Sequence, residues 1–267
     1  MEILNVSAEC FPVAKVGGLA DVVGALPKYQ KELGVDSKVI MPFYDNDFKK
    51  ENKFKVVNTG NLKLGRLRYE YEILRPIEPL EFTILLVDIP GLFDRSDVYS
   101  YEDDVERFLA FQLAVLDWLS RKNKKPSIVH CHDHQTGFIP FLMSHADKFS
   151  NLKELPSVFT IHNAQYQGQF GYDKLKYFPE FDLKKMGMID WDGSINPLAT
   201  AIKTSWRVTT VSPGYLEELK ENANGLETLI NKESDKFSGI LNGIDSNVWN
   251  PSTDKHLVKN YSNKSVN

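Results

Sequence analysis

The stretch SAECFPVAKVGGLADVVGALP, residues 7–27, decides how the fold of this chain is interpreted. The apolar residues before it predict a buried strand, and a helical pattern begins near Leu19. Lys15 stands just before Gly17 and Gly18, where the missing Cβ atoms let a ligand approach the backbone N–H groups. Such a loop, at a helix N-terminus and beside a cation, favours an anion such as a phosphate. The alternative is a tight strand-to-helix turn with a solvated lysine.

Short β-rich runs alternate with helical patterns along the rest of the chain. Strands are expected at residues 3–7, 38–41, 84–88, 128–132, 158–162 and 208–211, and the clearest helix at residues 103–121. This alternation predicts a Rossmann-like α/β fold, with a parallel sheet covered by helices on both faces. Period-two alternation in RLRYEYEIL, residues 66–74, predicts a small antiparallel insertion.

Amino-acid composition and charge indicate which partners and which cellular location to expect. The 267 residues are 42% hydrophobic and carry a net charge of −4, and no lysine or arginine stripe stands out. We therefore expect no nucleic-acid partner and no membrane partner. The N-terminus lacks the pattern of a secretory signal, and there are two cysteines, Cys10 and Cys131, too few for a disulfide framework. A cytoplasmic location is expected.

Polar clusters follow two of the central strands. HCHDH, residues 130–134, ends one strand and contains Asp133, and TIHN ends the next with His162 and Asn163. Because open α/β sheets bind ligands at the carboxyl ends of their strands, these clusters and the Lys15 loop are expected to converge. Two structural roles remain open. Asp133 can cap a following helix, and His162 can be a hydrogen-bonded core histidine.

The chain resembles a known family over nearly its whole length. The pattern S-x-E-x-x-P-x-x-K-x-G-G-L-x-D-V from Ser7 to Val22 is similar to the N-terminal signature of bacterial glycogen synthases and plant starch synthases, which are retaining glucosyltransferases of the GT-B fold. HCHDHQTGFIP, FTIHNAQYQG, VTTVSPGYLEEL and GILNGIDSNVWNP continue the resemblance in the same order. It implies that residues 1–250 form the N-terminal catalytic domain and residues 251–267 a polar linker or tail. A C-terminal GT-B domain, in cis or in trans, would complete the enzyme.

The resemblance also implies substrates and residue roles. The donor would be ADP-glucose and the acceptor an α-1,4-glucan such as glycogen or a maltooligosaccharide, with no cofactor and no metal. Catalytic roles are implied for His162, Asp133 and Lys15, and the isolated chain is expected to be inactive. The implied substrate-binding residues are Gly17, Gly18, Asp21, Tyr99, Asn163 and Asn242.

Two other classes of function remain as alternatives. The HCHDH run places histidines, a cysteine and an aspartate together, which are zinc ligands in metal-dependent hydrolases. The spacing is one residue short of H-x-H-x-D-H, and no second ligand group follows in matching form. A non-catalytic carbohydrate-binding or regulatory module is the other alternative.

Overall fold

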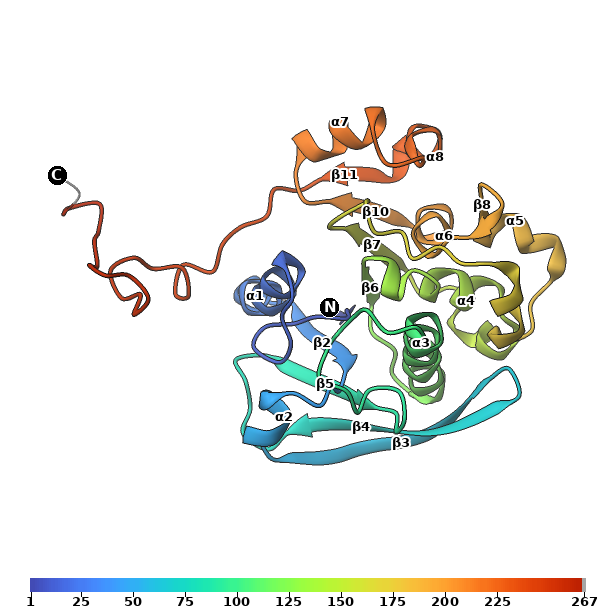
Figure 1. Ribbon diagram of the computed structural model, residues 1–267, viewed down its shortest axis with the longest axis horizontal. Helices are drawn as coiled ribbons and strands as arrows, with labels where there is room; N and C mark the ends of the chain where they lie inside the picture. The colour runs from blue at the N-terminus through green and yellow to red at the C-terminus, as the bar shows by residue number, and fades with distance from the viewer. Residues whose placement is uncertain (266–267) are drawn as a thin grey trace.

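A nine-stranded, mostly parallel sheet organises the computed structural model, which describes residues 1–265 (Figure 1). In spatial order its strands are β11 (Phe237–Gly239), β10 (Arg207–Thr210), β7 (Ser157–Ile161), β6 (Ile128–His132), β1 (Glu2–Val6), β2 (Asp36–Pro42), β5 (Thr83–Asp88), β4 (Leu67–Pro76) and β3 (Phe54–Leu64). All neighbouring pairs from β11 to β5 are parallel. The predicted Rossmann-like fold is confirmed.

The six expected strands all form, with ends that lie within two residues of the expected ones. Strand β11 was not expected, because its three residues are too short to show a period. The antiparallel insertion is confirmed but is larger than expected. Strands β3 and β4 form a long hairpin that turns at Gly65, where φ is 61°, and β4 pairs with β5, so the hairpin extends the main sheet at its edge.

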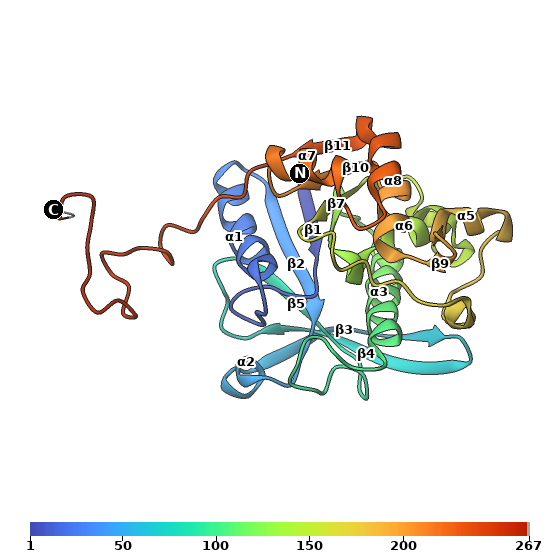
Figure 2. The same cartoon turned by 45° about the horizontal axis from the view of Figure 1, so that its top comes forward.

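Helices cover both faces of the sheet. They are α1 (Gly18–Glu32), α2 (Asp47–Glu51), α3 (Asp104–Arg121), α4 (Ile139–His145), α5 (Met186–Ile189), α6 (Pro197–Thr204), α7 (Pro213–Glu221) and α8 (Glu227–Lys232). Helices α1 and α3 lie on opposite sides of the central strands in both views (Figures 1 and 2). This follows from right-handed crossovers, because the chain moves in one direction from β1 to β2 and in the other from β5 to β6.

The long helix packs into the core through an apolar stripe. Phe108, Leu109, Leu113 and Leu116 of α3 are buried, and the helix begins one residue later than expected. Burying four such side chains contributes on the order of 1.5–3 kcal/mol each relative to exposure. The stripe is therefore structural, as its spacing indicates.

The sheet has a topological switch point between β1 and β6. The chain continues from β1 to β2 on one side, and it later crosses back to β6 on the other side. The loops that follow β1 and β6 therefore lead to opposite faces and leave a crevice at the carboxyl ends of these strands. The fold thus places the first-strand loop and the HCHDH run around one crevice.

The last described residues leave the body of the domain. After β11 the structure describes no helix or strand up to residue 265, and the chain runs outward as an extended trace in both views (Figures 1 and 2). One tether is an ion pair between Lys28 of α1 and Asp245, with Nζ 3.0 Å from Oδ2. Residues 251–265 follow an irregular course, their role as a linker or tail stays a prediction, and residues 266–267 lie outside the described part. Among the described helices, none has both the length and the apolar character needed to cross a bilayer.

Candidate functional site

A cavity of about 670 Å³ lies at the carboxyl ends of β1, β6 and β7. Seven predicted site residues line it: Gly17, Gly18, Tyr99, Asp133, His162, Asn163 and Asn242. These residues lie far apart in the sequence, and Gly17 and Asn242 are separated by 225 positions. The loops at the carboxyl ends of the strands therefore converge on one cavity, as expected for a ligand site in an open α/β sheet.

Asp133 holds the end of β7 in place. Its Oδ1 accepts a hydrogen bond of 2.7 Å from the backbone N–H of His162. Asp133 itself has a φ of 55° and a ψ of 177°, a combination that glycine adopts far more readily than aspartate, and its side chain makes no helix-capping bond. Instead of capping a helix, the Asp133 side chain therefore bridges the loops that follow β6 and β7.

The environment of Asp133 changes its acidity. Burial raises the pKa of the carboxyl group to about 7, against the lowering effect of the backbone N–H groups of His162 and Asn163. The charge of Glu9 adds to the increase in pKa. A carboxyl group that titrates near neutrality within a cavity is typical of a functional site.

His162 ends a chain of buried polar side chains that crosses the sheet. Its Nε2 lies 3.1 Å from Nδ1 of His132, whose Nε2 lies 3.3 Å from Oδ1 of Asn5. Asn5 in turn donates from Nδ2 to Oγ of Ser37, at 2.8 Å, and to the carbonyl of Lys38, at 3.2 Å. Burial lowers the pKa of His162 to about 3 and that of His132 well below its ordinary value, so both rings are neutral near pH 7.

The glycine loop is held by a carboxylate from the same segment. Oε2 of Glu9 accepts the backbone N–H groups of Val16, at 2.5 Å, and Gly17, at 2.9 Å. Oε1 of Glu9 accepts the hydroxyl of Tyr99 at 2.7 Å. The N–H of Gly18 begins α1 and is among the helix-start donors that no helical carbonyl accepts. Within the loop, Glu9 therefore occupies two of the donors available to an anion, and Tyr99 contributes a wall of the cavity.

Gly17 and Gly18 are not required by internal packing. A Cβ atom built on either glycine would meet no atom within 4 Å. Both residues line the cavity, so an added methyl group would reduce the space for a ligand. This is the arrangement expected where a backbone must be approached closely from outside.

Lys15 and Asp21 do not line the cavity; they pair with each other. Nζ of Lys15 lies 2.7 and 2.8 Å from the two carboxylate oxygens of Asp21, and both side chains are partly exposed. Nζ of Lys15 also lies 5.7 Å from the ring centroid of Trp249. The predicted contact of Lys15 with phosphate thus requires its ion pair with Asp21 to open.

The cavity is also lined by polar residues that were not predicted, and Glu9, His134 and Gln135 are among them. Nδ1 of His134 and Oε1 of Gln135 are buried and have no hydrogen-bond partner among residues 1–265. The His134 ring lies against Gly168, where a Cβ would come within 2.3 Å of it. Their place in the sequence could have identified His134 and Gln135 as site residues, because they directly follow Asp133 at the end of β6.

The histidines of the HCHDH run do not gather around a metal. His130 contacts Oγ1 of Thr160 through Nε2, at 2.6 Å, and His132 belongs to the Asn5 chain. No group of three or more potential metal-ligating side chains is present in the described part of the chain. Cys10 and Cys131 are both buried and unbridged.

Comparison with known proteins gives a consistent picture. A family model described as "Starch synthase catalytic domain" matches residues 2–232. A glycogen synthase of Flavobacterium johnsoniae is 55% identical over 98% of this chain and 56% of that protein. A glycogen synthase of Streptococcus agalactiae is 38% identical over 100% of this chain and 57% of that protein.

A solved structure is also similar. The catalytic domain of starch synthase IV from Arabidopsis thaliana, bound to ADP and acarbose, superposes with a TM-score of 0.86 at 32% identity. The match covers 98% of this chain and 56% of that one. The chain thus spans a little over half the length of the relatives it matches.

Proposed function

Because this chain belongs to the starch synthase catalytic domain family, we propose that it is the N-terminal half of a glycogen or starch synthase. The enzyme would transfer glucose from ADP-glucose to the non-reducing end of an α-1,4-glucan, with retention of anomeric configuration. One observation carries the proposal: Asp133, His162 and the Gly17–Gly18 loop converge on one cavity at the switch point of the sheet. A relative of the same fold is bound to ADP and acarbose, a nucleotide and an oligosaccharide analogue.

The polar groups of the cavity suit a sugar. The unpartnered atoms of His134 and Gln135 each cost about 1–3 kcal/mol while they stay buried without a hydrogen bond. Sugar hydroxyl groups, which both donate and accept, would satisfy them. Asn163 and Asn242 bring amide groups to the same cavity. We assign the donor glucose to the Asp133–His162 side, where the carboxylate of Asp133 would accept a hydroxyl of the sugar.

The diphosphate of the donor would lie toward the start of α1. The N–H of Gly18 and the positive end of the helix favour a phosphate there. Lys15 would exchange Asp21 for phosphate and stabilise the charge that develops as the glucosyl bond breaks, and Asp21 would then be free to accept a hydroxyl group. Glu9 would keep the loop in shape.

The cavity has little positive charge. No lysine or arginine is among the described residues that line it, and Lys15 of the adjacent loop is paired with Asp21. We propose that a C-terminal GT-B domain, in cis or in trans, supplies the opposite wall, and that the chain acts in the cytoplasm without a cofactor. Transition-state charge stabilisation amounts to several kcal/mol per group, so this chain alone should not turn over.

A radiolabelled transfer assay tests the proposal. The complete natural protein should move labelled glucose from ADP-glucose to glycogen, with UDP-glucose as the competing donor. The 267-residue chain should be inactive alone and gain activity when a separate C-terminal domain is added. Binding of maltooligosaccharide with no transfer by the complete protein would instead identify a carbohydrate-binding module.

A further inference from the structure

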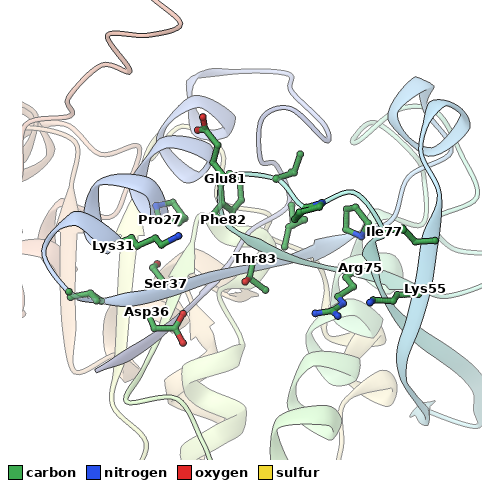
Figure 3. Close-up of a pocket in the computed structure, with 16 residues that line it drawn as sticks. Pro27, Lys31, Asp36, Ser37, Lys55, Arg75, Ile77, Glu81, Phe82 and Thr83 are labelled. Atoms are coloured by element: carbon green, nitrogen blue, oxygen red, sulfur yellow. The ribbon is translucent and has the colours of Figure 1, made fainter.

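A second cavity, of about 580 Å³, lies at the opposite edge of the sheet, where β2 and β5 begin (Figure 3). Its walls are the end of α1, the turn before β2, and the segment between β4 and β5. The volume is that of a site for a small molecule. The proposed glucosyl transfer uses the other edge and does not depend on this cavity.

Three cationic side chains line this second cavity without a carboxylate partner. No carboxylate oxygen of residues 1–265 lies within 4.0 Å of the charged nitrogens of Lys31, Lys55 or Arg75. The two acidic residues of the wall are already paired, Glu81 with Lys28 and Asp36 with Lys38. The cavity therefore has a surplus of positive charge.

Two of these cations are cross-strand neighbours. Lys55 of β3 and Arg75 of β4 are directly opposite partners in the antiparallel ladder, so their side chains leave the same face of the hairpin. Like charges in this position repel each other, and an anion between them would turn the repulsion into attraction. Figure 3 shows both side chains on one side of the cavity and Lys31 on the other.

We propose that this cavity binds a small organic phosphate. The guanidinium fork of Arg75 fits two phosphate oxygens, and Lys55 adds a second charge to the same group. Ile77, which is 51% exposed, and the half-buried Phe82 line the wall beside the cations and offer an apolar contact to the organic part. Lys31 would reach the ligand from α1.

The same hairpin contains a matched control. Lys63 and Arg68 are also directly opposite partners, near the turn of the hairpin, and neither lines the cavity. A variant with Lys63→Gln and Arg68→Gln removes the same charges as one with Lys55→Gln and Arg75→Gln. Both variants have the same net charge and lose the same kind of cross-strand pair. Only the Lys55→Gln/Arg75→Gln variant changes the lining of the cavity.

The test is a titration of the ¹⁵N-labelled chain with phenyl phosphate and with inorganic phosphate, at constant ionic strength, followed by amide NMR shifts. We expect saturable shifts at residues 75–83 and tighter binding of phenyl phosphate. The Lys55→Gln/Arg75→Gln variant should weaken binding at least about tenfold, and the Lys63→Gln/Arg68→Gln variant by less than about twofold. Equal losses in the two variants, shifts confined to the Gly17–Gly18 loop, or no saturable shift would overturn the proposal.

Discussion

Nε2 of His162 lies 3.1 Å from Nδ1 of His132, and this contact fixes the proton positions on both rings. Asn5 donates through Nδ2 to a backbone carbonyl, so its Oδ1 faces His132 and must receive the Nε2–H of that ring. A neutral His132 then has a bare Nδ1, which accepts the Nε2–H of His162. The Nδ1 of His162 is left as an acceptor.

This proton order predicts the effect of His132→Phe. The substitution keeps a ring but removes the acceptor of the His162 proton, so His162 should lose its single tautomer. Two buried polar atoms, on Asn5 and His162, would lose a partner, at a cost of about 1–3 kcal/mol each. Long-range ¹H–¹⁵N spectra of the imidazoles measure the tautomer directly. An Nε2–H tautomer of His162 that persists in the variant would contradict the account.

The buried histidines predict a loss of stability in mild acid. Burial lowers the pKa of His130 and His134 to about 4 and of His162 to about 3, all below the ordinary value of 6.5. The unfolded chain therefore binds more protons as pH falls from 6.5 toward 4, and the stability present above pH 6.5 is lost. Asp133 opposes this trend, because its pKa is raised and its folded form takes up a proton below about pH 7.

Urea unfolding between pH 7.5 and 4.5 measures this effect. Each such histidine contributes at most about 1.4 kcal/mol per pH unit to the fall in unfolding free energy. The variant His130→Gln should reduce the slope by about 1 kcal/mol per pH unit. A free energy of unfolding that stays level to pH 4.5 would show that these rings are not held neutral.

Substitution of the two loop glycines should lower activity and leave stability nearly unchanged. Gly17→Ala and Gly18→Ala add a methyl group into open space, so the unfolding free energy should change by less than about 1 kcal/mol. In the complete protein the same methyl groups should lower kcat/KM for the donor by at least about tenfold. Gly24→Ala is the opposite control, because its Cβ would lie 2.5 Å from the carbonyl oxygen of Phe11 and must destabilise the fold.

Lys15→Ala in the complete protein should lower donor turnover by about 100-fold and leave glucan binding within about threefold, since its charge matters where phosphate charge develops. Lys220→Ala is a matched control. It removes another lysine in an ion pair, with Glu217 on α7, far from the loop in the chain. Equal losses of turnover and glucan binding in Lys15→Ala would place the lysine outside the donor site.

The parts of the fold that depend on local pattern were predictable from sequence. The alternation of strand and helix patterns predicted six strands and a helix at residues 103–121, which forms at residues 104–121, because the spacing of apolar residues is a local property. The site residues on rigid strand ends, Asp133 and His162, converge because parallel strands end at one edge.

What depends on side-chain pairing was not predictable. Lys15 pairs with Asp21, and Glu9 takes up two loop N–H groups, because of a backbone path that no periodicity records. The contact between His132 and His162 joins residues 30 positions apart on separate strands. Such pairs follow from sheet register, which the sequence of one chain leaves open.

The most direct test of the proposed transfer site is kcat/KM for ADP-glucose in the complete protein carrying Asp133→Asn. Asparagine has the same shape as aspartate and keeps an oxygen to accept the N–H of His162, so the substitution removes the charge and leaves the backbone strain at this position unchanged. The account predicts a fall of about 100-fold at pH 8, with no loss of unfolding free energy, because a buried carboxylate is removed. A kcat/KM within about twofold of the unsubstituted protein would contradict it.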